Sequence, residues 1–200
     1  MISYDITLIG PLAKTAPQPL QGLIYYIDGG ARWRDQAQGM IVGDNDSWKG
    51  DKKQFDHLLP VDKNESDFAY TLGLLSGNSR EILTHGLWGG RFDHQLAILG
   101  DTNAWLLSNT GNRIWFTQEN KFTAAFFNQG NWSFDFHGTF SLFSFAKEEI
   151  EMDGKVKYPL SKNHQFKTWS SHGLSNNARG IFEIQTTGPT LLVFEADENM

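Results

Sequence analysis

Short apolar runs separated by polar and glycine-rich segments recur along the chain. In the first half they predict five short buried strands, over Ile6–Ile9, Leu23–Ile27, Met40–Val42, Asp56–Leu59 and Ile82–His85. Two longer stretches have apolar residues at helical spacing and predict helices over Ser66–Leu75 and Asp93–Leu107. Strands that alternate with helices are typical of an α/β layer, so we expect a Rossmann-like domain with a mainly parallel sheet.

The second half has a different pattern, in which apolar and polar residues alternate in short runs. It predicts strands over Arg113–Gln118, Lys121–Phe127, Trp132–Phe136, Phe140–Phe145, Ile181–Gln185 and Leu191–Glu195. Residues 103–200 hold 17 of the 27 aromatic residues, and aromatic residues favour strands. We therefore expect an α/β domain over residues 1–108 and an all-β sandwich or barrel over residues 109–200.

The charge balance, the absence of cysteine and the absence of long apolar runs exclude several classes of function. The 200 residues include 17 basic and 23 acidic side chains without a basic cluster, which argues against a nucleic-acid partner. The absence of cysteine excludes a disulfide scaffold, a thiolate metal site and a cysteine nucleophile. The sequence shows neither a signal-peptide pattern nor an apolar run near the roughly 18 residues of a membrane helix. We therefore expect a soluble cytoplasmic protein without a membrane partner.

Acidic turns follow two of the predicted strands. Leu23–Ile27 leads into Asp28-Gly29-Gly30, and Met40–Val42 leads into Gly43-Asp44-Asn45-Asp46-Ser47. Ligands of open α/β sheets bind beyond the carboxyl ends of the strands, where such carboxylates can share one Mg²⁺ ion. Aspartate and glycine are also ordinary turn residues, and for the second turn alone both interpretations stay open.

Two further segments precede the predicted helices. In Lys63-Asn64-Glu65-Ser66-Asp67, Ser66 is a candidate N-cap, while Asp67 is available to a metal and Lys63 to a phosphate. The segment Gly86–His94 places Gly89, Gly90 and Arg91 before a helix, where backbone N–H groups and a guanidinium bind phosphate. Asp93 is expected to cap the helix or reach the metal. His94 is available for acid–base chemistry, but we favour a packed position.

Taken together and in order, these segments resemble thiamine pyrophosphokinases. The resemblance rests on Asp28–Ala31, Gly43–Ser47, Ser66–Asp67 and Gly89–His94, and it continues through Lys155–Leu160 and Gly173–Asn176. It spans nearly the whole chain. Arg32, Asn45 and Asn177 depart from the residues that are common in the family, which indicates a divergent member.

The resemblance implies a nucleotide domain followed by a thiamine-binding domain, in a homodimer with thiamine at the subunit interface. It implies Mg²⁺-dependent transfer of the diphosphoryl group of ATP to the thiamine hydroxyl, which releases AMP. The implied metal ligands are Asp44, Asp46 and Asp67, with Asp28 and Asp93 as further catalytic residues. The remaining implied contacts are Lys63, Gly89, Gly90, Arg91 and Arg32 for ATP, and Ser175, Asn176 and Tyr158 for thiamine. Trp169 is an alternative stacking partner, although ordinary packing explains it more simply.

Two other classes of function stay open. One is a Mg²⁺-dependent phosphohydrolase or nucleotidyl-transfer enzyme that uses the same aspartates. The other is a non-catalytic binder of thiamine or carbohydrate that uses the aromatic second half. A degenerate family member that binds ATP without turnover is a third possibility.

Overall fold

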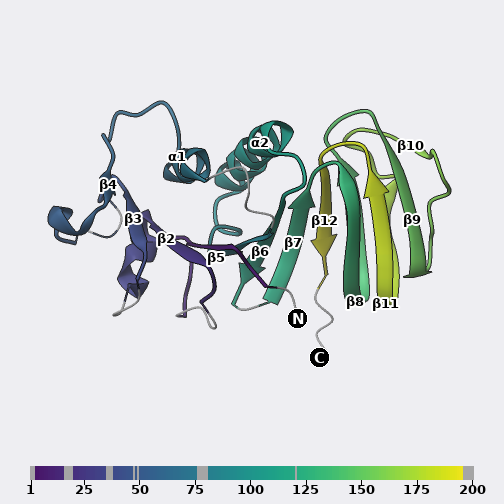
Figure 1. Cartoon of the computed structure of the whole chain (residues 1–200), viewed down its shortest axis with the longest axis horizontal. Coiled ribbons are helices and arrows are strands. Elements are labelled where there is room, and N and C mark those ends of the chain that lie inside the picture. Colours follow the sequence, from purple (N-terminus) through teal and green to yellow (C-terminus); the bar gives the residue numbers. More distant parts are fainter. Residues whose placement is uncertain are drawn as a thin grey trace.

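The computed structural model describes residues 3–15, 20–34, 38–46, 48, 50–75, 81–119 and 121–195 (Figure 1). Ser47, one residue of the second acidic turn, lies outside this part of the chain. Within it, twelve strands form one sheet. A large mixed sheet covered by few helices is therefore the basic architecture.

One half of the sheet is parallel. It contains β1 (Ile6–Ile9), β2 (Leu23–Ile27), β3 (Met40–Gly43), β4 (His57–Leu58), β5 (Glu81–His85) and β6 (Arg113–Gln118), in the order β6-β5-β1-β2-β3-β4. Because these strands run in one direction, the residues that follow β2, β3 and β5 lie at the same edge of the sheet.

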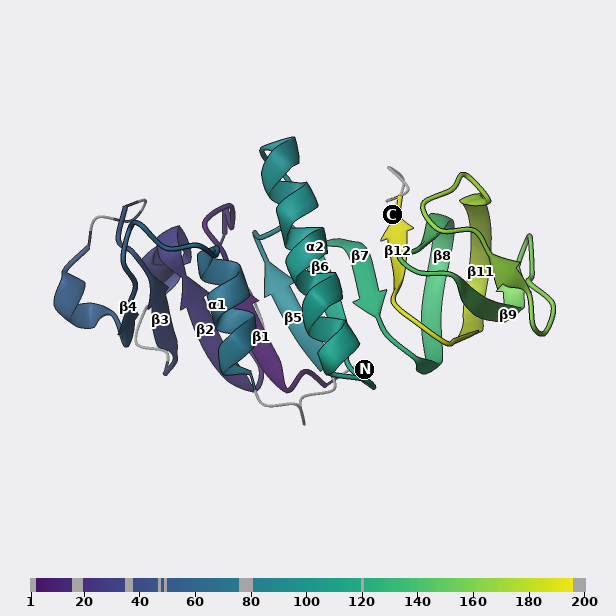
Figure 2. The same ribbon diagram turned by 90° about the horizontal axis from the view of Figure 1, so that it is seen from above.

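Both α-helices of the described chain cover one face of this parallel part (Figures 1 and 2). They are α1 (Asp67–Leu74) and α2 (Phe92–Ser108). Alternate strand residues, such as Leu8 and Ile82, pack with Phe68 and Leu106 of the helices in one buried cluster. The 3₁₀ helix η1 (Asp28–Trp33) contributes Ala31 to a second cluster with Ile9, Tyr26 and Ile41.

The second half of the sheet is antiparallel. It contains β7 (Lys121–Phe127), β8 (Gly130–Ser144), β9 (Glu148–Val156), β10 (Gln165–Phe166), β11 (Gly173–Thr186) and β12 (Thr190–Phe194), and its order is β10-β9-β11-β8-β12-β7. Stacked aromatic rings fill its core, with Phe182 between Phe134 at 5.4 Å and Phe140 at 4.9 Å. Most of the aromatic residues of this half therefore stabilise the fold.

The structure corrects the expected separation into two sheets. β6 pairs with β5 in parallel and with β7 in antiparallel fashion, so the same sheet continues across both halves. The antiparallel half is therefore not a separate sheet, whereas its expected sandwich or barrel shape stays a prediction. The Rossmann-like label is only partly supported, since in the described part of the chain two α-helices cover six parallel strands. The domain division at residue 108 stays a prediction, and the parallel pairing of β6 favours a later boundary.

Several strand bounds also differ from the expectation. The predicted strands 132–136 and 140–145 are parts of the single strand β8, which continues through Gly138. β9 and β10 were not predicted, and β4 covers only His57–Leu58. In the described part of the chain, none of the helices has the length and apolar character needed to cross a membrane.

Candidate functional site

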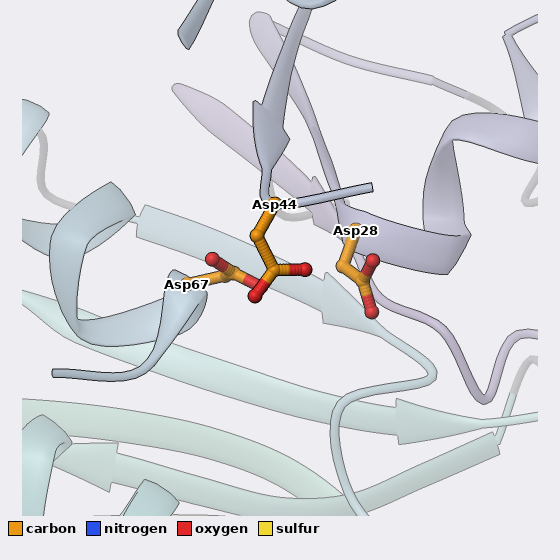
Figure 3. A group of neighbouring side chains, drawn as sticks. All are labelled: Asp28, Asp44 and Asp67. Carbon is orange, nitrogen blue, oxygen red and sulfur yellow. The ribbon is translucent and has the colours of Figure 1, made fainter. Parts of the chain in front are cut away.

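Three carboxylates converge at the edge where the parallel strands end (Figure 3). Asp28 directly follows β2, Asp44 directly follows β3, and Asp67 is the first residue of α1. One carboxylate oxygen from each lies within 4.8 Å of the other two. Segments far apart in the sequence thus bring three carboxylate oxygens to one point.

Local backbone features bring the three side chains together. Asp28 has a φ of +46°, which few non-glycine residues adopt, and it is only 9 % exposed. Gly43 allows β3 to approach, because a Cβ atom there would lie 3.0 Å from the Cα of Asp28. Ser66 caps α1 by accepting a hydrogen bond from the Ala69 N–H at 3.0 Å. This cap confirms the expected start of the helix and fixes the position of Asp67.

Lys63 lies among these acidic groups. Its Nζ donates to Oδ2 of Asp44 at 2.6 Å and is 3.1 Å from Oδ1 of Asp67. The Lys63 side chain is only 15 % exposed, so water screens these ion pairs weakly. The predicted phosphate ligand therefore lies at the acidic site, where it already neutralises part of the negative charge.

The pKa values of two carboxyl groups reflect this arrangement. Burial by itself would raise the pKa of Asp44, but hydrogen bonds from Lys63 and from the Asp46 backbone outweigh burial and lower it. Burial raises the pKa of Asp67, and the negative charges of Asp44 and Asp28 add to that effect against the opposing influence of Lys63. A cation placed between these groups would favour the ionised form of each.

The chemistry of the cluster fits a hard divalent cation. Oδ1 of Asp28 is buried and has no hydrogen-bond partner among the described residues. When ionised, three carboxylates carry three negative charges and Lys63 offsets one, which leaves the charge that one divalent ion balances. Oxygen ligands of this kind are those that Mg²⁺ prefers.

Asp46, which we expected as a metal ligand, is placed differently. The group of three contains Asp28 in its place. Asp46 is exposed, and its backbone N–H donates to Oδ1 of Asp44 at 3.1 Å, which orients that carboxylate. The i, i+2 spacing brings the two residues together, and both the backbone and the side chain of Asp46 hydrogen bond to Asp44. The role of Asp46 as a metal ligand stays a prediction.

The glycine-rich segment before α2 forms the expected turn, in which Gly89 and Gly90 have φ values of +102° and +71°. Arg91 and Asp93 form an exposed pair, with Nη2 of Arg91 2.6 Å from Oδ2 of Asp93. Asp93 is therefore not part of the group of three carboxylates. Its Oδ1 accepts from the backbone N–H of His94, which is exposed and not packed as we expected.

Arg32 stabilises the turn that carries Asp28. It belongs to η1, and its Nε donates to the carbonyl oxygen of Gly29 at 2.6 Å. A second hydrogen bond runs from its Nη2 to the carbonyl oxygen of Pro11 at 3.2 Å. The expected contact of Arg32 with ATP stays a prediction.

The residues expected to bind thiamine lie far from the carboxylates within one chain. Ser175 and Asn176 belong to β11, which is separated from β3 by seven other strands in the sheet order. Ser175 is exposed and has a φ of +57°. The Asn176 amide is already occupied: it accepts from the Tyr158 N–H at 3.0 Å and donates to the Tyr158 carbonyl at 2.8 Å. Asn176 thus holds the Tyr158 backbone in place.

The two candidate stacking residues present exposed rings, with Tyr158 at 53 % and Trp169 at 55 %. Trp169 packs one side of its ring against Phe145, with ring centroids 4.4 Å apart. Trp169 is therefore packed against Phe145 and still exposes enough of its ring to contact a ligand. The ring of Tyr158 lies 4.9 Å from Nζ of Lys157.

Sequence reasoning missed a buried histidine at the same edge of the sheet. The Thr117 hydroxyl donates to the Thr84 carbonyl at 2.7 Å, so it accepts from Nδ1 of His85 at 2.6 Å. Nε2 of His85 is then an acceptor, buried without a partner among the described residues. Burial lowers the pKa of His85 to about 4. A histidine that ends an apolar strand before a glycine turn is the signal that could have revealed it.

Comparisons with known proteins relate this architecture to a set of solved structures. No protein-family model and no curated protein matches the chain. Thiamine pyrophosphokinase from Bacillus subtilis matches at 18 % identity and a TM-score of 0.69, over 96 % of this chain and 99 % of that one. Thiamin pyrophosphokinase from Candida albicans matches at 14 % identity and a TM-score of 0.74, over 98 % and 90 % of the two chains. The yeast enzyme matches at 14 % identity and a TM-score of 0.67, over 95 % and 85 %. The protein thus has the fold seen in thiamine pyrophosphokinases, along nearly its whole length.

Proposed function

We propose that this protein is a thiamine pyrophosphokinase, which transfers the diphosphoryl group of ATP to the hydroxyl of thiamine. The observation that carries the proposal is the convergence of Asp28, Asp44 and Asp67 on a fold shared with such enzymes. The carboxyl ends of parallel strands are where open α/β sheets bind ligands. A cation site at this edge favours phosphate chemistry over simple binding of an uncharged ligand.

The proposed reaction is an in-line displacement. The thiamine oxygen forms a bond to the β-phosphorus of ATP and loses its proton. The bond between the β-phosphorus and the oxygen that bridges to the α-phosphorus breaks, and AMP leaves with that oxygen. Positioning and charge neutralisation dominate catalysis in such transfers.

The chain supplies groups for both tasks. Asp28, Asp44 and Asp67 would hold Mg²⁺, which when bound offsets the charge of the phosphate oxygens. Lys63 lies at the same carboxylates and can neutralise a further phosphate oxygen. The turn with Gly89 and Gly90 lies at the start of α2, where free backbone N–H groups favour an anion. Arg91 can add a guanidinium contact once it leaves Asp93.

The direct test supplies the purified protein with thiamine, ATP and Mg²⁺. We expect AMP and thiamine diphosphate in equal amounts. ADP as the nucleotide product would contradict diphosphoryl transfer, and phosphate release without thiamine diphosphate would favour a phosphohydrolase. Thiamine uptake in calorimetry without AMP formation would favour a binder, and ATP uptake without turnover a degenerate enzyme.

A substitution in the carboxylate group tests the site itself. Asp44→Asn keeps the shape of the side chain but removes one charge, and we expect it to lower the rate by at least about a hundredfold. The matched control is Asp135→Asn, which changes an exposed aspartate of β8 and should leave the rate unchanged. Circular-dichroism melts of both variants establish that the loss concerns the site. Equal rates for Asp44→Asn and the wild type would remove the site from the proposal.

We further propose that two chains combine to form each thiamine site. Within one chain, Ser175 and Tyr158 lie at the far end of the sheet from the carboxylates, so a second copy must bring them to the metal. Symmetric dimers are the commonest way to achieve this. We also propose that the protein is cytoplasmic and that Arg32 contacts ATP.

Complementation tests the shared site. We expect Asp44→Asn and Ser175→Arg to be inactive separately, because each damages one half of every site. After the two proteins are unfolded and refolded together, mixed dimers contain one intact site, and about a quarter of the wild-type activity should return. Mixtures that stay inactive, although dimers form, would argue against a site made by two chains.

A further inference from the structure

Two histidines face each other at the far end of the sheet from the carboxylates. His164 directly precedes β10, and His172 directly precedes β11. Their Nε2 atoms are 3.3 Å apart, and their ring centroids are 4.9 Å apart. Both line a cavity of about 710 Å³ that also reaches Glu151 and Asp153 of β9.

Packing fixes the positions of both rings. Phe166 is buried, and the His172 ring stacks on it at 4.8 Å with an angle of 8° between the ring planes. The His164 ring meets the same phenylalanine edge-on at 6.3 Å. Backbone hydrogen bonds anchor His164, which accepts from Ile150 at 3.0 Å and donates to Ser161 at 3.2 Å.

The residue after His172 also contributes to this placement. A Cβ atom on Gly173 would overlap the Leu142 carbonyl oxygen and would lie 2.8 Å from the Phe166 ring. Glycine therefore allows the start of β11 to lie directly against β8 and Phe166. The contacts with Phe166 thus hold the two imidazoles in place, although His172 is exposed and His164 only half-buried.

The separation of the two nitrogens matches a specific metal geometry. With zinc–nitrogen distances of roughly 2.05 Å, two ligands at the tetrahedral angle have nitrogens about 3.3–3.4 Å apart. We propose that His164 and His172 form a Zn²⁺ site, with Nε2 of each ring as the ligand atom. Neutral imidazole suits zinc, whereas Mg²⁺ prefers the oxygens of the carboxylate group.

The proposed site is open. Within the described part of the chain, no third histidine or carboxylate joins the pair closely enough to form a three-ligand group. Two tetrahedral positions therefore remain for water or for an oxygen ligand from the adjoining cavity. Zinc bound there would connect the β9–β10 connection to the start of β11, next to the segment that carries Ser175.

Zinc titration of the full-length protein, prepared without a histidine tag and in excess Mg²⁺, tests this proposal. We expect one zinc ion per chain to bind in a histidine-dependent manner, and zinc to raise the melting temperature. Co²⁺ in place of zinc should give the intense visible absorption of tetrahedral coordination.

Two variants identify the ligands. His172→Phe keeps an aromatic ring on Phe166 but removes the nitrogen, and His164→Ala removes the other ligand; each should weaken zinc binding at least about tenfold. His137→Ala, at an exposed histidine of β8, is the matched control and should bind zinc like the wild type. The proposal fails if the wild type does not bind zinc, in which case the rings only hydrogen bond to each other. It also fails if His172→Phe and His164→Ala bind as tightly as His137→Ala.

Discussion

At the scale of single residues, backbone conformation decides which side chains meet. Asp28 and Ser175 both have positive φ angles, which cost roughly 1–3 kcal/mol each for residues other than glycine. Such strain persists only where the surrounding structure imposes it. At Asp28 it accompanies a carboxylate directed at Asp44 and Asp67, so the strain supports a functional role for this aspartate.

Replacing either of two glycines by alanine should change the free energy of unfolding, in opposite directions at the two positions. A Cβ atom on Gly30 would overlap the carbonyl oxygen of Ile9, so Gly30→Ala should lower the free energy of unfolding by about 3 kcal/mol. Gly100 lies inside α2 with open space around it, and Gly100→Ala should raise the free energy of unfolding by about 0.5–1 kcal/mol. Urea denaturation measures both variants. A loss of stability in Gly100→Ala, or none in Gly30→Ala, would contradict these packing arguments.

At the scale of elements, local patterns predicted most strands and both helices. β1, β2, β6 and β7 have the predicted bounds, and α1 begins directly after the predicted cap Ser66. The hydroxyl of this serine also donates to Asp101 of α2 at 3.0 Å. Capping and periodicity are local properties, so the sequence reveals them without knowledge of distant contacts.

The two strands that were not predicted have specific reasons. β9 does alternate, since Glu148, Ile150 and Met152 are buried, but its many acidic residues conceal the pattern. A two-residue strand such as β10 gives no periodic signal at all. β8 continues through Gly138 because that glycine pairs with Ala178 of β11, a contact that the local sequence cannot show.

At the scale of the whole molecule, one sheet joins the group of three carboxylates near one end to a histidine pair at the other. The buried groups of this sheet also determine how stability depends on pH. Burial raises the pKa of Glu148 to about 7 from its usual 4.5 and lowers the pKa of His85 to about 4 from its usual 6.5. Their effects on folding have opposite signs.

The signs follow from proton binding. Between pH 4.5 and 7 the folded chain holds a proton on Glu148 that the unfolded chain has lost, so the free energy of unfolding falls as pH rises. Between pH 6.5 and 4 the unfolded chain protonates His85 while the folded chain keeps it neutral, so the free energy of unfolding falls as pH falls. In the shared interval the two contributions oppose each other.

Single substitutions should therefore reveal each contribution. We expect Glu148→Gln to raise the free energy of unfolding on the order of 2 kcal/mol at pH 8 and to change it little at pH 4.5. His85→Gln should show the reverse: it should raise the free energy of unfolding near pH 4.5 and change it little at pH 8. Urea denaturation across this pH range measures both, and a gain that is equal at the two pH values would refute the assignment.

The sequence by itself determined the strands, the helices and the acidic turns, because periodicity, caps and turn residues act over a few neighbours. Only the tertiary structure decided that one sheet runs through both halves of the described chain and that Asp28 lies beside Asp44 and Asp67. Strand pairing and side-chain direction depend on contacts between distant segments and on backbone angles such as that of Asp28. The same reason applies to His164 and His172, whose rings meet because Phe166 and the start of β11 hold them together.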